Sequence, residues 1–386
     1  MINVFYVYAL MWSFILVLYL MGWSNLCIHL DSGLLVFIIF AIISSFWVGY
    51  LMRSKMKFFK LEKEPKKTTK ITCLLVLLYI ADFLYAGKIP LLQVINGVSY
   101  KSGGYKGIPG LHILISAFAI FYSVYLAYVY FSFKKKKVLI EYFWVISFFI
   151  LLMQRQNIFI CILLFFNIWF LNLFLENRDK IKVKKYKYIT IAIVIIMILT
   201  YCFGVFGNIR YGSLFAWNDY TMISKLGQMN SNYPKILPKA FFWGYTYTVT
   251  PLVNLNYNIL NVDQNDNLGY FLIEFIPEFI SHHLFEDYNK EPVLLPVRSL
   301  TASTAYVRTY NYFGYVGMYS IYIIQLMICV FIINLTYLNQ RKYFVVVANC
   351  ILYYFVFTFF ANTMVYTTTA LVAIYSFLCN IKIKKY

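Results

Sequence analysis

Long apolar segments separated by short polar connections recur along most of the chain. Ten of them have about the length that an α-helix needs to cross roughly 30 Å of hydrocarbon. They cover Val4–Gly22, Gly33–Met52, Ile71–Gly87, Leu111–Phe133, Val138–Met153, Ile158–Leu175, Ile189–Gly207, Tyr312–Leu335, Tyr343–Phe360 and Tyr366–Ile381. This pattern predicts an all-α polytopic membrane protein with about 10 (10–12) transmembrane helices.

One polar stretch, residues 208–311, interrupts the regular alternation. Within it, Ala240–Leu260 and Leu268–Phe285 are semi-apolar and rich in aromatic residues, which is typical of helices that lie in a membrane interface. Pro251 and Pro277 favour short interfacial or re-entrant helices over further spans. The predicted regions are an N-terminal bundle of about seven spans (1–207), a long loop (208–311) and about three C-terminal spans (312–386).

Composition supports the membrane assignment. The chain has 386 residues, of which 62% are hydrophobic and 13% charged, whereas a soluble domain carries roughly 25% charged residues. Its 37 Tyr and 37 Phe exclude a disordered chain. The net charge of +19 comes from basic residues gathered between apolar segments, so no nucleic-acid partner is expected. The seven cysteines include no C-x-x-C pair and are interpreted as packing residues, and no metal site is indicated.

The distribution of lysine and arginine predicts the orientation. If the N-terminus is cytoplasmic, the connections and tail on that side hold 23 basic residues, against 4 in the short connections on the other side. Cytoplasmic loops carry such an excess, so both termini are expected in the cytoplasm and the long loop outside. Val4–Gly22 has no basic segment before it and no small-residue cleavage site, which favours a first span over a signal peptide.

Arginine is concentrated on the predicted outer side. Four of the 11 basic residues there are Arg, compared with three of 23 inside. The planar guanidinium forms paired hydrogen bonds with phosphate oxygens and keeps its charge, so the set predicts an anion site. Taken singly, an arginine such as Arg155, in the hairpin Met153–Asn157, could equally be a snorkelling interface residue. The four candidates are Arg155, Arg210, Arg298 and Arg308.

Candidate acid–base groups lie in the second aromatic stretch of the long loop. Glu274 and Glu278 are spaced i, i+4, and a helix would place both on one face with His282 one turn further. Carboxylates and imidazoles in an aromatic interface are suited to proton transfer. The alternative is the polar face of a surface helix, and Pro277 argues against a continuous helix.

Three other titratable residues adjoin predicted spans. Asp82 lies inside the third span toward its outer end, which makes it either a functional candidate or a residue facing a wet cavity. His29 and His112 flank spans and are interpreted as interface residues. The chain contains no P-loop, no Rossmann glycine pattern, no H-E-x-x-H and no G-x-S-x-G, so nucleotide-driven transport and common hydrolase chemistry gain no support.

Four stretches, taken with this layout, resemble the bacterial O-antigen polymerases, the Wzy-type polymerases of oligosaccharide repeat units. The last of them contains a Thr-rich run and an F-G-x-x-G turn before the next span, although Asn311 stands where an Asp is expected. The stretches are Tyr85–Leu92 with Tyr105–His112, Gln154–Asn157, Gly207–Gly212 with Tyr245–Asn254, and Leu300–Gly317.

The resemblance implies a metal-independent, GT-C-like glycosyltransferase of the bacterial inner membrane that needs no cofactor. Its substrate would be an oligosaccharide linked to undecaprenyl diphosphate, polymerised into O-antigen or capsular polysaccharide at the periplasmic face. A chain-length regulator and a flippase are the partners that the family implies, besides membrane lipid. The four arginines would bind the diphosphate, and Glu278 or His282 would serve as base. The alternatives are an O-antigen ligase and a lipid-linked oligosaccharide flippase or transporter.

Overall fold

The fold is known from a computed structural model that describes residues 3–56, 59–96, 104–176, 190–191, 193–194, 197–208, 218–285 and 292–380. Helices make up 72% of it, and no strand occurs among the described residues. Six helices are long and apolar enough to cross a membrane, and three more are apolar but shorter. The protein is therefore all-helical and a multi-pass membrane protein.

The helices follow the predicted segments closely. The six long ones are α2 (Ser32–Met52), α3 (Thr68–Ala86), α5 (Leu111–Phe133), α7 (Arg155–Glu176), α13 (Val307–Asn339) and α14 (Phe344–Val356) with its flanking 3₁₀ turns η2 (Arg341–Tyr343) and η3 (Phe357–Phe359). The shorter apolar ones are α1 (Val4–Leu20), Met197–Asn208 and α15 (Thr367–Leu378). The remaining helices are α4 (Pro90–Ile95), α6 (Lys136–Leu151), α9 (Thr221–Leu226), α10 (Ala240–Asn261), α11 (Leu268–Ile273) and α12 (Glu278–Leu284).

Each of the ten predicted spans contains helix, although the seventh, Ile189–Gly207, falls partly outside the described residues. The helix nearest the predicted fifth span, α6, has 16 residues and is not among those long enough to cross. The existence of many apolar helices is thus confirmed, and the count of ten spans stays a prediction.

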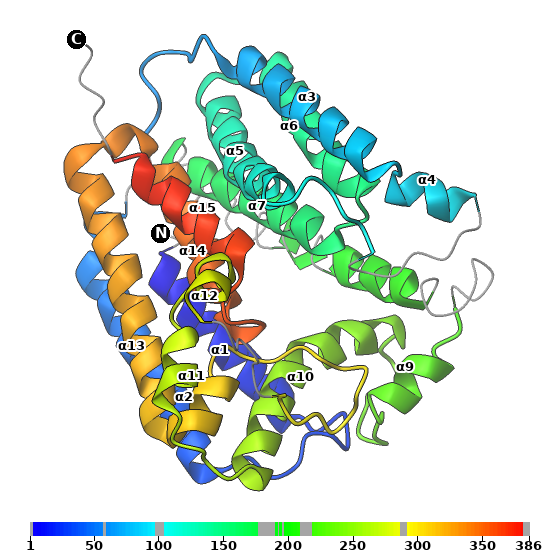
Figure 1. Cartoon of the computed structure of the whole chain (residues 1–386). Helices are drawn as coiled ribbons and strands as arrows, with labels where there is room; N and C mark the ends of the chain where they lie inside the picture. Colours follow the sequence, from blue (N-terminus) through cyan, green and yellow to red (C-terminus); the bar gives the residue numbers. More distant parts are fainter. Residues whose placement is uncertain are drawn as a thin grey trace.

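Two groups of helices are joined by α14 and α15 (Figure 1). One group consists of α3, α5, α6 and α7, and the other of α1, α2, α10 and α13. Both α14 and α15 pack against α5 and against α13, and α14 also packs against α1. The most apolar windows of α5 and α14 are 67% buried, compared with 28% in α3. The bundle is thus built around α5 and α14, and the outer faces of α2 and α3 present large apolar side chains such as Trp47 and Leu77.

The helix α13 begins at Val307, earlier than the predicted Tyr312, and contains a kink. Phe313 and Gly314 have non-helical dihedral angles, with φ of 55° at Gly314. Only glycine adopts this conformation without strain, and a Cβ there would lie 2.5 Å from Nε2 of Gln264. The predicted F-G-x-x-G turn is therefore a kink within one helix.

The long polar stretch contains helices, as predicted. The longest of them, α10, holds Pro251 in its interior and is not among the candidate spans. It packs against α1 and α13, while α11 packs against α13. Their location in the membrane interface stays a prediction.

Candidate functional site

The lysine-rich connections meet at one end of the bundle. Lys55, after α2, donates a hydrogen bond of 2.6 Å to Oδ1 of Asn334 near the end of α13. Lys135, between α5 and α6, pairs with Glu64 between α2 and α3. This arrangement follows from the alternating directions of successive helices and leaves the other end of the bundle for the remaining connections.

The opposite end, called here the polar end, is formed by the connections α1–α2, α3–α5, α6–α7 and α14–α15, together with the long stretch before α13. Direct contacts join these parts. Asp31, before α2, donates its amide N–H to Asn256 on α10, and Asn362, before α15, donates to Glu274. Among the described candidates, Glu274, Glu278, His282, Arg298 and Arg308 all belong to this end.

Glu274 and Arg308 form a buried ion pair at the polar end. Glu274 is 1% exposed, and its Oε1 lies 3.7 Å from Nη1 of Arg308, which is half-buried at the start of α13. Asn362 donates through Nδ2 to Oε2 of Glu274 at 2.9 Å and to its carbonyl oxygen at 3.0 Å. Among the described residues, Oε1 accepts no hydrogen bond, and its contact with the Arg308 guanidinium is an ion pair without one. The Arg308 side chain is 28% exposed, so it remains partly accessible while it is paired with Glu274.

The structure separates the predicted acid–base residues. Glu274 follows the last residue of α11, and Pro277 immediately precedes α12, which begins at Glu278. The interruption arises because proline cannot donate an intrahelical hydrogen bond. The prediction that one helical face carries both Glu274 and Glu278 is therefore wrong, and the two carboxylates have different surroundings. Glu278 is half-buried and His282 exposed on a helix of seven residues.

A second polar cluster surrounds Asp82, near the end of α3. Asp82 is fully buried, and its carboxylate accepts three hydrogen bonds. The donors are the Tyr105 hydroxyl at 2.8 Å, the Ile108 amide at 2.7 Å and Nδ1 of His112 at 2.7 Å. Gly107 allows this close wrapping, because a Cβ there would lie 2.2 Å from Oδ1 of Asp82. The cluster explains how an ionisable group is kept inside an apolar helix.

His112 extends this cluster to the α6–α7 connection. Its Nε2 lies 3.5 Å from Nε2 of Gln154, whose Oε1 accepts a hydrogen bond of 2.8 Å from Asn157. Gln154 directly precedes Arg155, the first residue of α7. The structure thereby joins two stretches that carry the polymerase resemblance, Tyr105–His112 and Gln154–Asn157.

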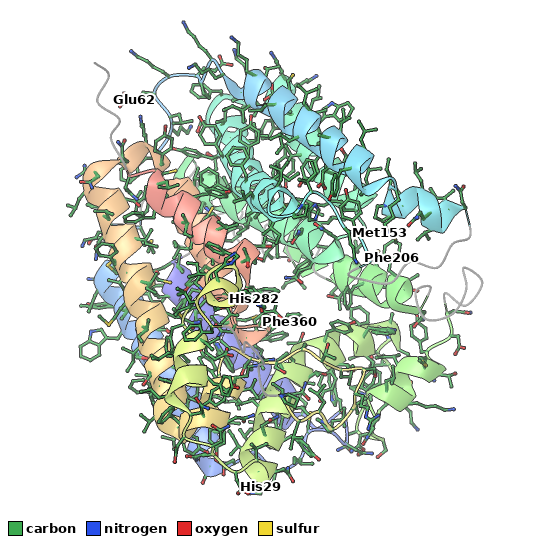
Figure 2. The ribbon with its side chains drawn as sticks, viewed as in Figure 1. His29, Glu62, Met153, Phe206, His282 and Phe360 are labelled. Carbon is green, nitrogen blue, oxygen red and sulfur yellow. The ribbon has the colours of Figure 1, made fainter. Side chains whose placement is uncertain are left out.

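Helix α14 lies next to elements that carry both clusters. It packs against α7, and its end leads through η3 to Asn362. In the view of Figure 2, Met153 and Phe206 lie on one side, and His282 and Phe360 on the other. Both clusters belong to connections of the polar end.

Asparagines on α10 hold the surrounding connections. Asn254 donates to the carbonyl oxygens of Leu300 and Ala302, and Asn258 binds both the N–H and the carbonyl of Leu294. Asn256 donates to the carbonyl oxygen of His29. Asn254 and Asn258 thereby fix the path of the segment leading to α13, and Asn256 fixes the connection before α2.

Asp31 caps α2 and links it to α13. Its carboxylate accepts from the Leu34 amide and from the Tyr315 hydroxyl. Partial desolvation raises the pKa of Asp31, but the hydrogen bonds from Tyr315 and from the Leu34 and Gly33 amides outweigh it. The pKa of Asp31 therefore lies below its ordinary value.

The four predicted arginines are placed unequally. Arg308 belongs to the ion pair with Glu274, and Arg298 is exposed in the segment that precedes α13. The side chain of Arg155 and the whole of Arg210 lie outside the described residues. A shared site for all four therefore stays a prediction.

The described residues indicate no metal site, and the comparisons with known proteins identify no relative. In the described part of the chain, no group of three or more His, Cys, Asp or Glu residues could hold a metal ion. Comparison of the sequence with protein families, and of the chain with curated proteins and solved structures, finds no match. The interpretation of the site rests on its residues.

Sequence reasoning missed the pairing of Asp82 with His112. The available signal was the buried acid itself, because a carboxylate within a span requires donors close by. The sequence interpretation of His112 as an interface residue overlooked its contact with Asp82, which lies thirty positions earlier in the sequence.

Proposed function

We propose that the protein polymerises oligosaccharide repeat units carried on undecaprenyl diphosphate. The reaction would transfer the growing glycan from its lipid diphosphate to a sugar hydroxyl of the next unit, at the periplasmic face of a bacterial inner membrane. The product would be O-antigen or capsular polysaccharide. The observation that carries this proposal is the partly exposed side chain of Arg308, paired with buried Glu274 at the polar end of a multi-pass membrane protein.

The chemistry of the reaction suits this end. Negative charge develops on the departing diphosphate, and cations that are already in position lower the barrier where charge develops. Arg308 would contribute one such cation, with Arg155, Arg210 and Arg298 completing the set. The lipid tail stays in hydrocarbon while the sugars stay in water, so the reacting bond must lie at a membrane boundary. In this scheme the lysine-rich end and both termini face the cytoplasm.

The base for the acceptor hydroxyl would come from the same end. The sequence predicts Glu278 or His282 for this role, and α12, which carries both, begins four residues after Glu274. Aromatic residues of the long stretch would stack on the apolar faces of sugar rings. Membrane lipid, a flippase that delivers the units and a chain-length regulator would be the partners.

Deletion of the gene in its host tests the reaction class. We expect envelope glycan capped with a single repeat unit, because units would still be delivered and attached without being polymerised. Loss of all glycan would favour a flippase, and accumulation of long lipid-linked polymer would favour an O-antigen ligase. Either outcome would contradict the proposal.

Arginine variants test the diphosphate role. Arg155→Lys, Arg210→Lys and Arg308→Lys are each expected to shorten the polymer strongly at normal expression, because lysine lacks the paired donors of the guanidinium. Arg341→Lys is the matched control. Arg341 lies at the opposite end of the bundle and donates to the Tyr337 carbonyl, so that variant should retain full chain length. Unchanged chain length in the first three variants would remove the diphosphate role.

A further inference from the structure

The hydrogen bonds of Asp82 determine which nitrogen of His112 carries a proton. An ionised carboxylate can only accept hydrogen bonds, so the 2.7 Å contact requires an N–H at Nδ1 of His112. In the neutral imidazole, the lone pair then lies at Nε2. The other two donors, the Tyr105 hydroxyl and the Ile108 amide, hold the carboxylate itself in place. His112 is thus fixed in one tautomer and one orientation.

The basic nitrogen of His112 points toward the α6–α7 connection, and the side chain that carries it is partly exposed. The side chain of His112 is 19% exposed, whereas that of Asp82 is fully buried. With the proton at Nδ1, Nε2 accepts a long hydrogen bond of 3.5 Å from the amide of Gln154, the residue before Arg155, and an acceptor hydroxyl would take the place of that amide. A buried carboxylate on one ring nitrogen, with only a long contact at the other, is an arrangement that orients an imidazole for proton transfer.

We propose that His112 is the base that accepts the proton of the acceptor sugar hydroxyl, and that Asp82 is its positioning residue. This assignment rests on the proposed function and replaces Glu278 and His282 in that role. It is favoured because His112 lies in the first turn of α5, a helix of 23 residues, and is fixed by Asp82, whereas His282 is exposed on a seven-residue helix.

In the proposed step, the O–H proton of the acceptor passes to Nε2 of His112 while the oxygen forms a bond to the anomeric carbon of the donor. The bond from that carbon to the diphosphate oxygen breaks, and its electron pair leaves with the diphosphate. The imidazolium, paired with Asp82 while charged, then releases its proton to water.

Kinetics in a reconstituted system test this role. The substrate is the lipid-linked repeat unit extracted from a host strain that lacks the protein, and the enzyme is the full chain in lipid nanodiscs. His112→Ala should lower kcat by about 100- to 10,000-fold, with KM little changed. Added imidazole should restore part of the rate, which a purely structural role of His112 would not allow.

Asp82 and a control histidine complete the design. Asp82→Asn should also lower kcat, because an amide can donate to Nδ1 and thereby favour the wrong tautomer. The double variant with His112→Ala should be no slower than His112→Ala alone, since the two residues act as a unit. His29→Ala is the matched control and should keep the wild-type rate. His29 is exposed, and its ring contacts the Leu30 carbonyl.

Four results would overturn the assignment. The first is a kcat for His112→Ala within about threefold of wild type, which is less than the smallest effect expected of a base. The second is a loss of kcat that imidazole does not relieve, and the third is a double variant whose loss of kcat is the product of the two single losses. The fourth is imidazole rescue of His282→Ala in place of His112→Ala. His112→Gln, which keeps a donor for Asp82, separates catalysis from folding and should lose activity while its Tm stays close to wild type. A wild-type enzyme that forms no polymer would overturn the proposed function itself, which is a distinguishable result.

Discussion

The Glu274–Arg308 pair permits a sharp test of the packing at the polar end. Replacing Arg308 with Gln removes the cation from Oε1 of Glu274, whose residue is 1% exposed. The Asn362 amide still donates to Oε2 of that carboxylate. Two unit charges at about 4 Å interact by roughly 4 kcal/mol at an effective dielectric constant of 20. Breaking a buried pair from one side costs about 3–5 kcal/mol. Because the Arg308 side chain is 28% exposed, we expect the lower value, about 3 kcal/mol.

The measurement is thermal unfolding in detergent micelles, followed by the fluorescence of the seven tryptophans. At about 2 °C per kcal/mol, Arg308→Gln should lower Tm by roughly 6 °C. Adding Glu274→Gln to it should raise Tm again, because the buried charge is then absent. Arg298→Gln is the control, since Arg298 is exposed, and should change stability by less than about 0.5 kcal/mol. A wild-type Tm for Arg308→Gln, or a double variant less stable than that single variant, would refute the reasoning.

Asp31→Ala should destabilise the protein by about 1 kcal/mol at neutral pH, because α2 loses its N-cap. The pKa of Asp31 is lowered in the folded state, so the ionised carboxylate stabilises the fold above the unfolded pKa, and this stabilisation is lost as pH falls through the folded pKa. The Tm difference between Asp31→Ala and wild type should therefore shrink below about pH 3.9. Gly107→Ala should displace Asp82 and release His112, since the added methyl would lie 2.2 Å from a carboxylate oxygen; a lower Tm and a reduced polymerisation rate are expected.

Gly269→Ala is the matched control for Gly107→Ala. Its nearest neighbour would be Oδ1 of Asn267, at 3.3 Å, so a small change in Tm is expected. Equal effects of the two glycine variants would contradict the role given to Gly107. A Tm difference between Asp31→Ala and wild type that is constant down to acidic pH would contradict the ionic contribution of Asp31.

The span pattern could be predicted where apolar length alone decides the structure. The segment Leu111–Phe133 is helical over the predicted residues, and α2 differs from its prediction by one residue at its start. Hydrocarbon thickness imposes this length, so no tertiary information is needed. The start of α13 was missed because residues 307–311 end the polar stretch and contain no apolar run. The helix also continues through the kink at Gly314, where the sequence predicted a turn.

Parts of the site depended on contacts that sequence spacing does not reveal. Glu274 was identified, but its partner proved to be Arg308 together with Asn362, both distant in sequence. Asp82 was singled out by its position in a span, while His112 required the loop geometry that brings it within 2.7 Å. The roles of Arg155 and Arg210 remain predictions from composition and from the family resemblance.

The asparagines of α10 have a consequence for how sequences of this type can diverge. They donate to the main-chain carbonyl oxygens of Leu294, Leu300 and Ala302, which every residue type offers in the same form. Substitutions in residues 294–302 would therefore leave the course of this segment unaltered while changing the side chains that it exposes. Under the proposed function, new glycan preferences would arise there without changes to the helices beneath.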